Sequence, residues 1–306
     1  TASPTRLYRK VFQPGAEVLP NGNCGLGQLT TVGYNQHIKN GQYLRDYYVD
    51  KVGLIPPTWL DDPSQFHLRS DNALRTEESG QALFSGLYPE ATDRLAAKTT
   101  SGIPVVPFYV EDEDTDTMTY NPTRCPGINN LTAKIAADPK YVEHIAKITT
   151  PLAKELTNVF GLPVPPTGWT SGIATKLDCL MTHRCHNFSL PAGVTPDLFA
   201  AVIEDDTWTY GFQLNYTGFV KLAVGTFMGE LLDNMKAMIA TQQPTSDVSR
   251  APPPARKARK FWVYAGHDDG PVMPMMAALG AYHGVWSPYA TLIALELYNS
   301  SSGSLS

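Results

Sequence analysis

The sequence has no excess of positive charge. Its 306 residues include 24 Lys or Arg and 29 Asp or Glu, which gives a formal net charge of −5. Binding along a nucleic-acid backbone needs concentrated positive charge. The basic cluster at residues 256–260 follows three prolines and is typical of a solvated loop. The composition therefore argues against a nucleic-acid partner.

Long hydrophobic runs are also missing. No window approaches the roughly 18–20 apolar residues that a membrane-spanning helix needs. Residues 1–4 lack the order of positive charge followed by apolar residues that marks a signal peptide. We therefore expect no membrane attachment to be encoded in this chain. A 42% share of hydrophobic residues still supplies material for a substantial core.

Cysteine is scarce, with four residues in the chain. Two of them, Cys179 and Cys185, lie in the short span CLMTHRC and predict a small disulfide loop. The alternative is a zinc site that adds His183 and His186, because sulfur and imidazole are the usual zinc ligands. The spacing matches no closed structural zinc pattern, so the disulfide is the favoured interpretation.

Four glycosylation sequons accompany these cysteines. Their asparagines are Asn130, Asn187, Asn215 and Asn299. A single sequon is close to chance, but four of them beside a candidate disulfide favour an oxidising compartment. We therefore expect a secretory-pathway glycoprotein that is secreted or lies in the lumen of the lysosome or Golgi.

The hydrophobic pattern predicts alternating strands and helices. Apolar residues at steps of three and four predict helices over 29–53, 76–87, 141–160 and 218–240, with Thr30 or Thr31 as cap of the first. Residues 65–70 are interpreted as a strand that leads into a loop, and short apolar runs predict strands at 103–110 and 261–266. The order strand, polar loop, helix occurs around both 65–87 and 261–280, which is typical of α/β proteins.

We therefore predict a three-layer α/β core with a mostly parallel or mixed central sheet flanked by helices. Residues 1–118 and 207–306 would form this core, and residues 119–206 a smaller, mainly helical cap. The acidic run at 111–114 is interpreted as a solvated face.

Two of the predicted strands end in polar clusters. One cluster contains Arg69, Ser70, Asp71 and Arg75, and the other contains His267, Asp268 and Asp269. Guanidinium groups present paired donors that suit phosphate oxygens, and an imidazole can add a charged donor to the same anion. A carboxylic acid can give a proton to a departing alkoxide. These are the parts of a phosphomonoesterase, although Arg and Asp in loops are also common turn formers and surface ion pairs.

Longer motifs surround these clusters. Residues 68–76 have the sequence LRSDNALRT and are followed by GLYP at 86–89, while GHD at 266–268 is followed by WSPYA at 286–290. Together with GLGQLT at 25–30 and NGQYLR at 40–45, this ordered set resembles the histidine acid phosphatases, branch 2 of the histidine phosphatase superfamily. It is most similar to the group that contains lysosomal acid phosphatase and 2-phosphoxylose phosphatase.

The resemblance implies a chemistry for each cluster. Enzymes of this family use a histidine in an RHG-x-R motif to attack phosphorus, and the resulting phosphohistidine is hydrolysed by water. By resemblance, Arg69 would bind the phosphate, His267 would be the second pocket histidine and Asp268 would protonate the leaving oxygen. Arg75 would support the phosphate-binding loop from behind. The expected substrate is a phosphomonoester, and neither a metal nor any other cofactor is expected.

The chain departs from the family at the nucleophile. None of its seven histidines lies in an RHG sequence, and the motif is expected upstream of Thr1 together with the first strand of the sheet. His67 precedes Arg69 by two residues, but the flanking arginine and glycine are absent, so we interpret it as a packed strand histidine. The alternative is a non-catalytic homologue that binds a phosphorylated ligand or serves as a subunit of an assembly. The sequence leaves a homodimer or a larger assembly open.

Overall fold

The computed structural model of this protein describes residues 27–59, 62–90, 106–161, 173–242 and 259–298. The chain divides into two compact units. Unit 1 comprises residues 1–119, 226–272 and 288–306, and unit 2 comprises residues 120–225 and 273–287. Each unit is described below by itself.

A parallel sheet organises unit 1. Its strands are β1 (Phe66–Ser70), β2 (Tyr109–Val110) and β3 (Phe261–Ala265), and their order is β2-β1-β3. Both neighbours run parallel to β1, with Arg69 opposite Tyr109 on one side and Tyr264 on the other. Strands β1 and β3 are therefore adjacent although nearly two hundred residues separate them.

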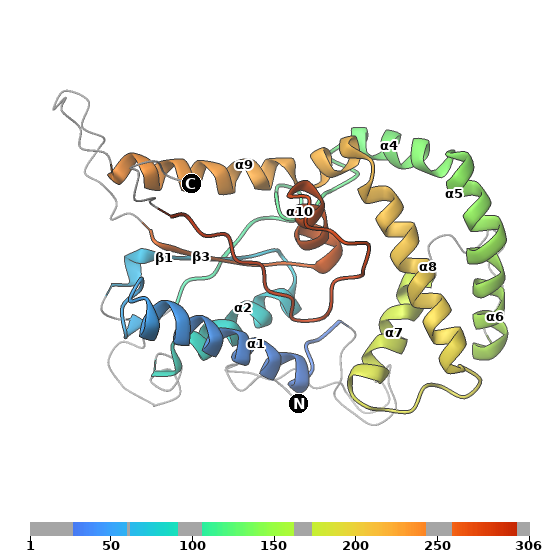
Figure 1. The fold of residues 1–306 in the computed structure, drawn as a ribbon, viewed down its shortest axis with the longest axis horizontal. Coiled ribbons are helices and arrows are strands. Elements are labelled where there is room, and N and C mark those ends of the chain that lie inside the picture. Colours follow the sequence, from blue (N-terminus) through green and yellow to red (C-terminus); the bar gives the residue numbers. More distant parts are fainter. Residues whose placement is uncertain (1–26, 60–61, 91–105, 162–172, 243–258, 299–306) are drawn as a thin grey trace. The chain divides into compact units, whose positions relative to one another are not determined.

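One face of the sheet packs on two helices. Helix α1 (Thr31–Leu44) continues into the π-helical segment η1 (Arg45–Lys51), and α2 (Leu74–Leu87) follows β1. Side chains alternate along a strand, and Phe66 and Leu68 of β1 join Val263 of β3 in the core cluster with residues of both helices. Figure 1 shows α1 and α2 on the same side of β1 and β3.

The contact between α1 and α2 requires glycine at two positions. A Cβ atom on Gly41 would lie 1.9 Å from the carbonyl oxygen of Leu83, and one on Gly86 would lie 2.0 Å from that of Ile38. Any side chain would force the helices apart, so these glycines bring the two backbones into direct contact. Thr30 caps α1 by accepting a hydrogen bond from the Gly33 N–H at 3.1 Å.

The opposite face of the sheet is covered by the C-terminal part of α9. This helix spans Thr217–Gln242, and its residues from Thr226 onward belong to unit 1. The Phe227 ring meets the Tyr264 ring edge to face at a centroid distance of 5.0 Å. In Figure 1 the strands lie between α9 and the α1/α2 pair. The predicted three-layer α/β core is confirmed.

Most of the predicted elements of unit 1 are present with shifted ends. The strands predicted at 65–70 and 261–266 are β1 and β3, and the helix predicted at 76–87 begins two residues earlier, at Leu74. The strand predicted at 103–110 is much shorter, because only Tyr109–Val110 pair with β1. Residues 103–105 lie outside the described residues. Two short helical turns, η3 (Pro63–Gln65) and η6 (Asp268–Val272), flank β1 and β3.

Unit 2 is helical. Its elements are α4 (Pro126–Ala136), α5 (Pro139–His144), the π-helical η4 (Ile145–Thr149), α6 (Thr150–Phe160), α7 (Ile173–Cys185), α8 (Pro196–Leu214), the start of α9 and α10 (Met273–Ala278). Its core contains Ala153, Leu156, Leu180, Val194, Leu198 and Val202. The predicted cap ended at residue 206, but α8 is one continuous helix across that position.

The predicted disulfide is not present in the structure. Cys185 is an exposed free thiol at the end of α7. Cys179 lies on the same helix six residues earlier, and at about 1.5 Å of rise per residue their Cα atoms are about 9 Å apart along the axis. A disulfide usually joins Cα atoms less than about 7 Å apart, so a continuous helix over both cysteines excludes the bridge.

Membrane-spanning length is also lacking among the described helices. None of them combines enough residues with enough apolar character to cross a bilayer.

Candidate functional site

The two polar clusters of the sequence lie at adjacent strand ends. Arg69 is the fourth residue of β1, and His267 follows β3 by two residues. Because β1 and β3 are parallel neighbours, their carboxyl ends meet at one edge of the sheet, where α/β proteins commonly build binding sites. The backbone pairing continues past the strands, since Asp71 donates its N–H to the Ala265 carbonyl at 3.0 Å.

The guanidinium of Arg69 is buried in a group of carboxylates. Its side chain is 4% exposed. Nη1 donates to Glu230 at 2.6 Å, and Nη2 donates to Asp116 at 2.9 Å and to the Thr117 hydroxyl at 3.0 Å. Glu111 forms a further ion pair at 3.0 Å. Burial alone would lower the pKa of Arg69, but the hydrogen bond and charge of Glu230 lead the opposing interactions and raise it.

This environment differs from the prediction for Arg69. A guanidinium that binds phosphate was expected, and the structure surrounds it with three carboxylates, Glu111, Asp116 and Glu230. The acidic run was predicted to face solvent, but the Glu111 carboxylate lies against Arg69. One donor stays open, because the buried Nε of Arg69 has no hydrogen-bond partner within the described part of the chain.

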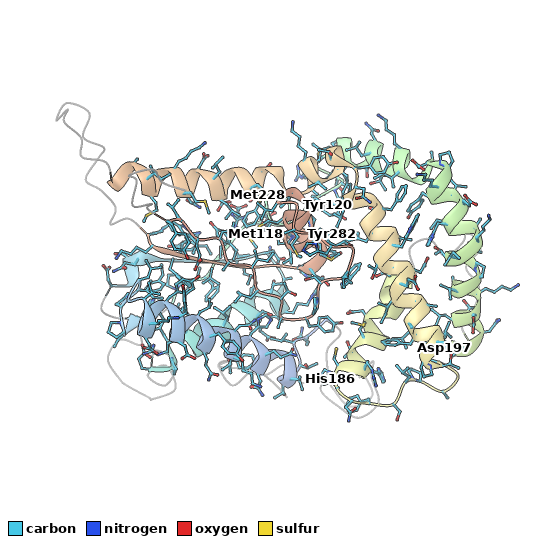
Figure 2. All side chains as sticks on the ribbon, in the orientation of Figure 1. Met118, Tyr120, His186, Asp197, Met228 and Tyr282 are labelled. Atoms are coloured by element: carbon cyan, nitrogen blue, oxygen red, sulfur yellow. The ribbon has the colours of Figure 1, made fainter. Side chains whose placement is uncertain are left out.

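Backbone contacts help to hold this carboxylate group in place. Met118, labelled in Figure 2, is fully buried and donates its backbone N–H to Asp116 at 2.9 Å. On the α9 side, the Tyr264 hydroxyl donates to Glu230 at 3.2 Å and accepts from Asn234 at 3.0 Å. The segment 111–117 and helix α9 therefore hold the Arg69 side chain directly, and Tyr264 of β3 supports the Glu230 contact.

His267 is held by Asp71. Its Nδ1 lies 2.7 Å from Asp71 Oδ2, and its backbone N–H donates to the same oxygen at 3.2 Å. The other carboxylate oxygen of Asp71 accepts a hydrogen bond from the Thr76 hydroxyl of α2. Asp71 is 1% exposed, so all of these contacts are shielded from water.

The surroundings of His267 favour its charged form. The hydrogen bond to Asp71 is the largest effect and raises the pKa of His267, burial lowers it, and the Asp71 charge raises it further. The positive charge of Arg75 lowers this pKa, and the carboxylate of Asp269 raises it, with a net pKa above the ordinary histidine value. The Nε2 atom of His267 is buried and has no partner among the described residues. These surroundings favour the imidazolium, in which Nε2–H would be a buried donor.

Asp268 begins the π-helical turn η6 directly after His267. Its Oδ1 accepts a hydrogen bond from the Asp269 N–H at 3.0 Å. The turn brings the Pro271 ring close to Gly266, where a Cβ atom would lie only 2.5 Å from that ring. Glycine at position 266 therefore permits this tight turn directly after β3.

Arg75 and His67, the other two residues considered in the sequence, do not make these contacts. Arg75 is exposed at the start of α2, and its charge reaches His267. His67 stacks on Tyr109 at a ring distance of 4.9 Å, and burial is the main cause of its lowered pKa. These observations agree with a packed strand histidine.

The sequon asparagines of unit 2 are accessible. Asn130, Asn187 and Asn215 are all exposed, and Asn299 lies outside the described residues. Asn187 adopts a left-handed backbone conformation (φ 56°) just after His186, which is labelled in Figure 2. Glycosylation itself stays a prediction.

Within the described ranges, no three His, Cys, Asp or Glu side chains gather in a way that could hold a metal ion. The carboxylates of the site are instead occupied by Arg69, His267 and hydroxyl groups.

The sequence interpretation missed the partners of the two predicted residues. Asp71 was visible in the motif RSD beside Arg69, but nothing local indicated that it would bind His267, 196 residues away. Glu230 lies on a helix that the apolar pattern identified, yet only packing against the sheet shows that it points to Arg69. The acidic run at 111–114 is largely exposed, as predicted, but its contact with Arg69 through Glu111 was not predicted.

Comparison with known proteins agrees with this fold. Residues 7–184 match the family model of the histidine phosphatase superfamily, branch 2. The chain therefore belongs to this family, as the motifs predicted.

Named relatives extend the match over almost the whole chain. Counting factor 60 of Dictyostelium discoideum is 36% identical, over 96% of this chain and 64% of that protein. Lysophosphatidic acid phosphatase type 6 of Bos taurus is 27% identical, over 92% and 59%, and lysosomal acid phosphatase of Xenopus laevis is 25% identical, over 91% and 60%. The chain thus spans about 60% of the length of the curated relatives that it matches.

Solved structures show the same fold. A Klebsiella sp. ASR1 phytase superposes with a TM-score of 0.52 and 15% identity, over 91% of this chain and 65% of the other. The Hafnia alvei phytase in its apo form gives a TM-score of 0.53 with 16% identity, over 91% and 72%.

Proposed function

We propose that this chain carries the phosphate-binding and proton-donating part of a phosphomonoesterase of the acid phosphatase type. The observation that carries this proposal is the state of His267. A buried carboxylate contacts its Nδ1 and favours its charged form, in which the buried Nε2, without a partner among the described residues, is a donor. A charged donor that is free and shielded from water is suited to binding an anion. The family membership of the chain makes a phosphate group the expected anion.

In the proposed reaction a nucleophilic histidine attacks phosphorus and the bond to the leaving oxygen breaks. Asp268 gives its proton to that oxygen. A water molecule then attacks the phosphohistidine, its proton returns to Asp268, the bond from phosphorus to the histidine breaks, and inorganic phosphate is released. Nε2–H of His267 donates to the phosphoryl oxygens, where negative charge must be stabilised in the transition state. Because Asp268 acts in its protonated form, we expect an acidic pH optimum.

Arg69 contributes through its Nε–H in this proposal. Glu230 and Asp116 hold the two Nη atoms, so the guanidinium cannot rotate freely. The unpartnered Nε–H is then the donor that would reach a phosphate oxygen. Asp71 lies two residues beyond Arg69, a spacing that returns side chains to the same face of an extended chain. This spacing supports the placement of Arg69 and His267 around one ligand.

The proposal requires a nucleophile from outside residues 1–306, because no histidine of the chain lies in an RHG sequence. The sheet offers a place for it. Within the described residues β3 is an edge strand, although both of its faces are packed, with Val263 in the core and Tyr264 against α9. An edge strand buried on both faces leaves backbone donors and acceptors that a further parallel strand would satisfy.

The acid role of Asp268 predicts a dependence on the leaving group. In the complete protein, Asp268→Asn should slow an alkyl phosphate by about 100-fold or more. It should slow p-nitrophenyl phosphate much less, because nitrophenolate leaves without a proton. Steady-state kcat/KM with both substrates tests this expectation, with Asp233→Asn as the matched surface control, since that side chain is 79% exposed. Equal losses for the two substrates would remove Asp268 from the acid role.

The covalent intermediate can be tested separately. Rapid mixing of the complete protein with labelled substrate, followed by alkaline quenching, should leave label on a histidine, because phosphohistidine survives in base and is lost in acid. Activity should also be insensitive to chelators. Loss of activity on chelation, reversed by a divalent metal, would contradict the metal-free mechanism.

A non-catalytic phosphate-binding protein is the second candidate. The buried Nε2 of His267, without a partner among the described residues, supports it equally, because anion binding needs no nucleophile. Under this alternative the complete protein binds inorganic phosphate at the same pocket, and His267→Ala weakens that binding, but no phosphomonoester is hydrolysed at any pH. Calorimetric binding of phosphate alongside an activity assay separates the two functions.

We also propose that the protein resides in the lumen of the secretory pathway. Support comes from the exposure of Asn130, Asn187 and Asn215. Treatment of the native protein with an N-glycosidase should increase its electrophoretic mobility, and Asn187→Gln should remove part of that change. Native protein that shows no mobility change would contradict this assignment.

A further inference from the structure

The buried carboxylate of Asp71 binds two different elements. One oxygen accepts from the Thr76 hydroxyl on α2, and the other accepts from both Nδ1 and the backbone N–H of His267. Asp71 is 1% exposed and His267 is 22% exposed at its side chain. The ring of His267 is thus fixed from one side by an acceptor that water does not reach.

The backbone of Asp71 is fixed as well. Its N–H donates to the Ala265 carbonyl at 3.0 Å, and its own carbonyl accepts from the Ala73 N–H at 2.8 Å. The first bond joins the segment after β1 to the end of β3, two residues before His267. The distance between Asp71 and the imidazole is therefore set by the pairing of the two strands.

This geometry determines which ring nitrogen faces a ligand. An acceptor at Nδ1 keeps a proton on that nitrogen in both the neutral and the charged ring. Nε2 then becomes the atom that gains or loses the second proton, and it is the buried atom without a partner among the described residues.

We propose that Asp71 is a positioning residue for the reaction at this site, which acts through His267. Its carboxylate sets the orientation, the tautomer and the charge of the imidazole, so that Nε2–H is aimed at the phosphoryl group. This inference rests on the function proposed above.

Other charged groups also face His267. Arg75 at the start of α2 opposes protonation of the ring, and Asp269 in η6 favours it. Asp71 on the β1 side makes the hydrogen bond, which is the largest influence on the ring. Loss of the Asp71 charge should therefore leave Arg75 to dominate among the neighbouring charges, with Asp269 as the opposing one.

The first test uses the unaltered protein. Nitrogen NMR of the complete protein, labelled at histidine and assigned with His267→Gln, should show the neutral ring of His267 with its proton on Nδ1. This is the minor tautomer of free histidine, so it reports an acceptor at Nδ1. A neutral ring with its proton on Nε2 would overturn the proposal.

The second test removes the charge. Asp71→Asn should lower kcat/KM for p-nitrophenyl phosphate about 10- to 100-fold, the cost of a hydrogen bond to a charged group, with most of the loss in kcat. Because the pKa of His267 falls when its carboxylate partner is lost, the alkaline limb of the pH–rate profile should move to lower pH. Asp233→Asn, which removes the same charge from the exposed ion pair with Lys236, should leave kcat and the limb unchanged.

The outcomes separate this inference from the proposed function. If His267→Ala retains full activity, the proposed function fails. If His267→Ala is inactive while Asp71→Asn keeps the wild-type rate and alkaline limb, the role of Asp71 fails alone. If Asp71→Asn does not fold, the tautomer of the unaltered protein decides the question.

Discussion

Two histidine–aspartate pairs occur in different units of this protein, and both are held at the same distance. In unit 1, His267 lies 2.7 Å from Asp71, and in unit 2, His144 lies 2.7 Å from Asp205. Both carboxylates are nearly inaccessible, with 2% and 1% of their side chains exposed. A π-helical turn follows each histidine, η6 in unit 1 and η4 in unit 2. Neither the pair nor the turn therefore distinguishes a reactive site from a structural contact.

The surroundings of the histidines do make the distinction. The ring of His144 stacks on Trp208 at a centroid distance of 3.6 Å and an angle of 11°. Asp205 also accepts a hydrogen bond from the Thr149 hydroxyl at 2.8 Å. These contacts of Asp205 with His144 and Thr149 join the segment around η4 to α8. His267 instead keeps a buried nitrogen without a partner among the described residues. We propose that this unpartnered nitrogen at a strand end, and not the first hydrogen bond, marks His267 as part of a binding site. The unpartnered Nδ1 of His67 instead lies within β1, where the ring stacks on Tyr109.

The strongest test of this contrast compares the two histidines by activity. His267→Ala in the complete protein should lower kcat/KM for p-nitrophenyl phosphate about 100- to 1,000-fold, since one preorganised donor to the transition state is lost. His144→Ala should leave kcat/KM close to the wild-type value. A comparable loss in both variants would show that the two pairs are not functionally different.

The second test compares stability. Asp205→Ala should lower the free energy of unfolding by about 2–4 kcal/mol, because the donors of His144 and Thr149 lose a shared buried acceptor. Urea denaturation measures this change. The exposed Asp233→Ala should change the free energy of unfolding by less than about 0.5 kcal/mol. An Asp205→Ala protein as stable as this control would show that the pair in unit 2 does not hold its helices together.

The smallest expected effect is the pH dependence of stability at His267. Its pKa is raised in the folded protein, chiefly by Asp71. A group with a raised folded pKa contributes stability that is fully present below its unfolded pKa and is lost as the pH rises through the folded value. The difference in unfolding free energy between the wild type and His267→Gln should therefore be larger in acid than above neutrality. A difference that grows with pH would mean that His267 folds as the neutral ring.

Local signals predicted the elements of the fold well. The segments predicted as strands at 65–70 and 261–266 are β1 and β3. Thr30 was one of two candidate caps, and its hydroxyl accepts from the Gly33 N–H. The alternation of strands and helices was enough to predict a parallel sheet.

Local signals failed where distant segments pair. The strand predicted at 103–110 pairs with β1 over two residues, because length of pairing depends on the neighbour and not on the apolar run. The disulfide prediction treated CLMTHRC as a loop, and the segment is the end of α7. Residues 112–114 of the acidic run are exposed, as expected, but no local signal showed that Glu111 and the nearby Asp116 would pair with a buried guanidinium.

The sequence by itself determined the family, the order of strands and helices, and the identity of Arg69, His267 and Asp268 as candidate site residues, since motifs and apolar periodicity are properties of neighbouring residues. Only the tertiary structure decided that Asp71 would hold His267 and that Glu230 would hold Arg69. Asp71 and His267 are 196 residues apart in the sequence, and Arg69 and Glu230 are 161 residues apart. Parallel strand pairing and the packing of α9 on the sheet bring them together, and no local pattern encodes either one.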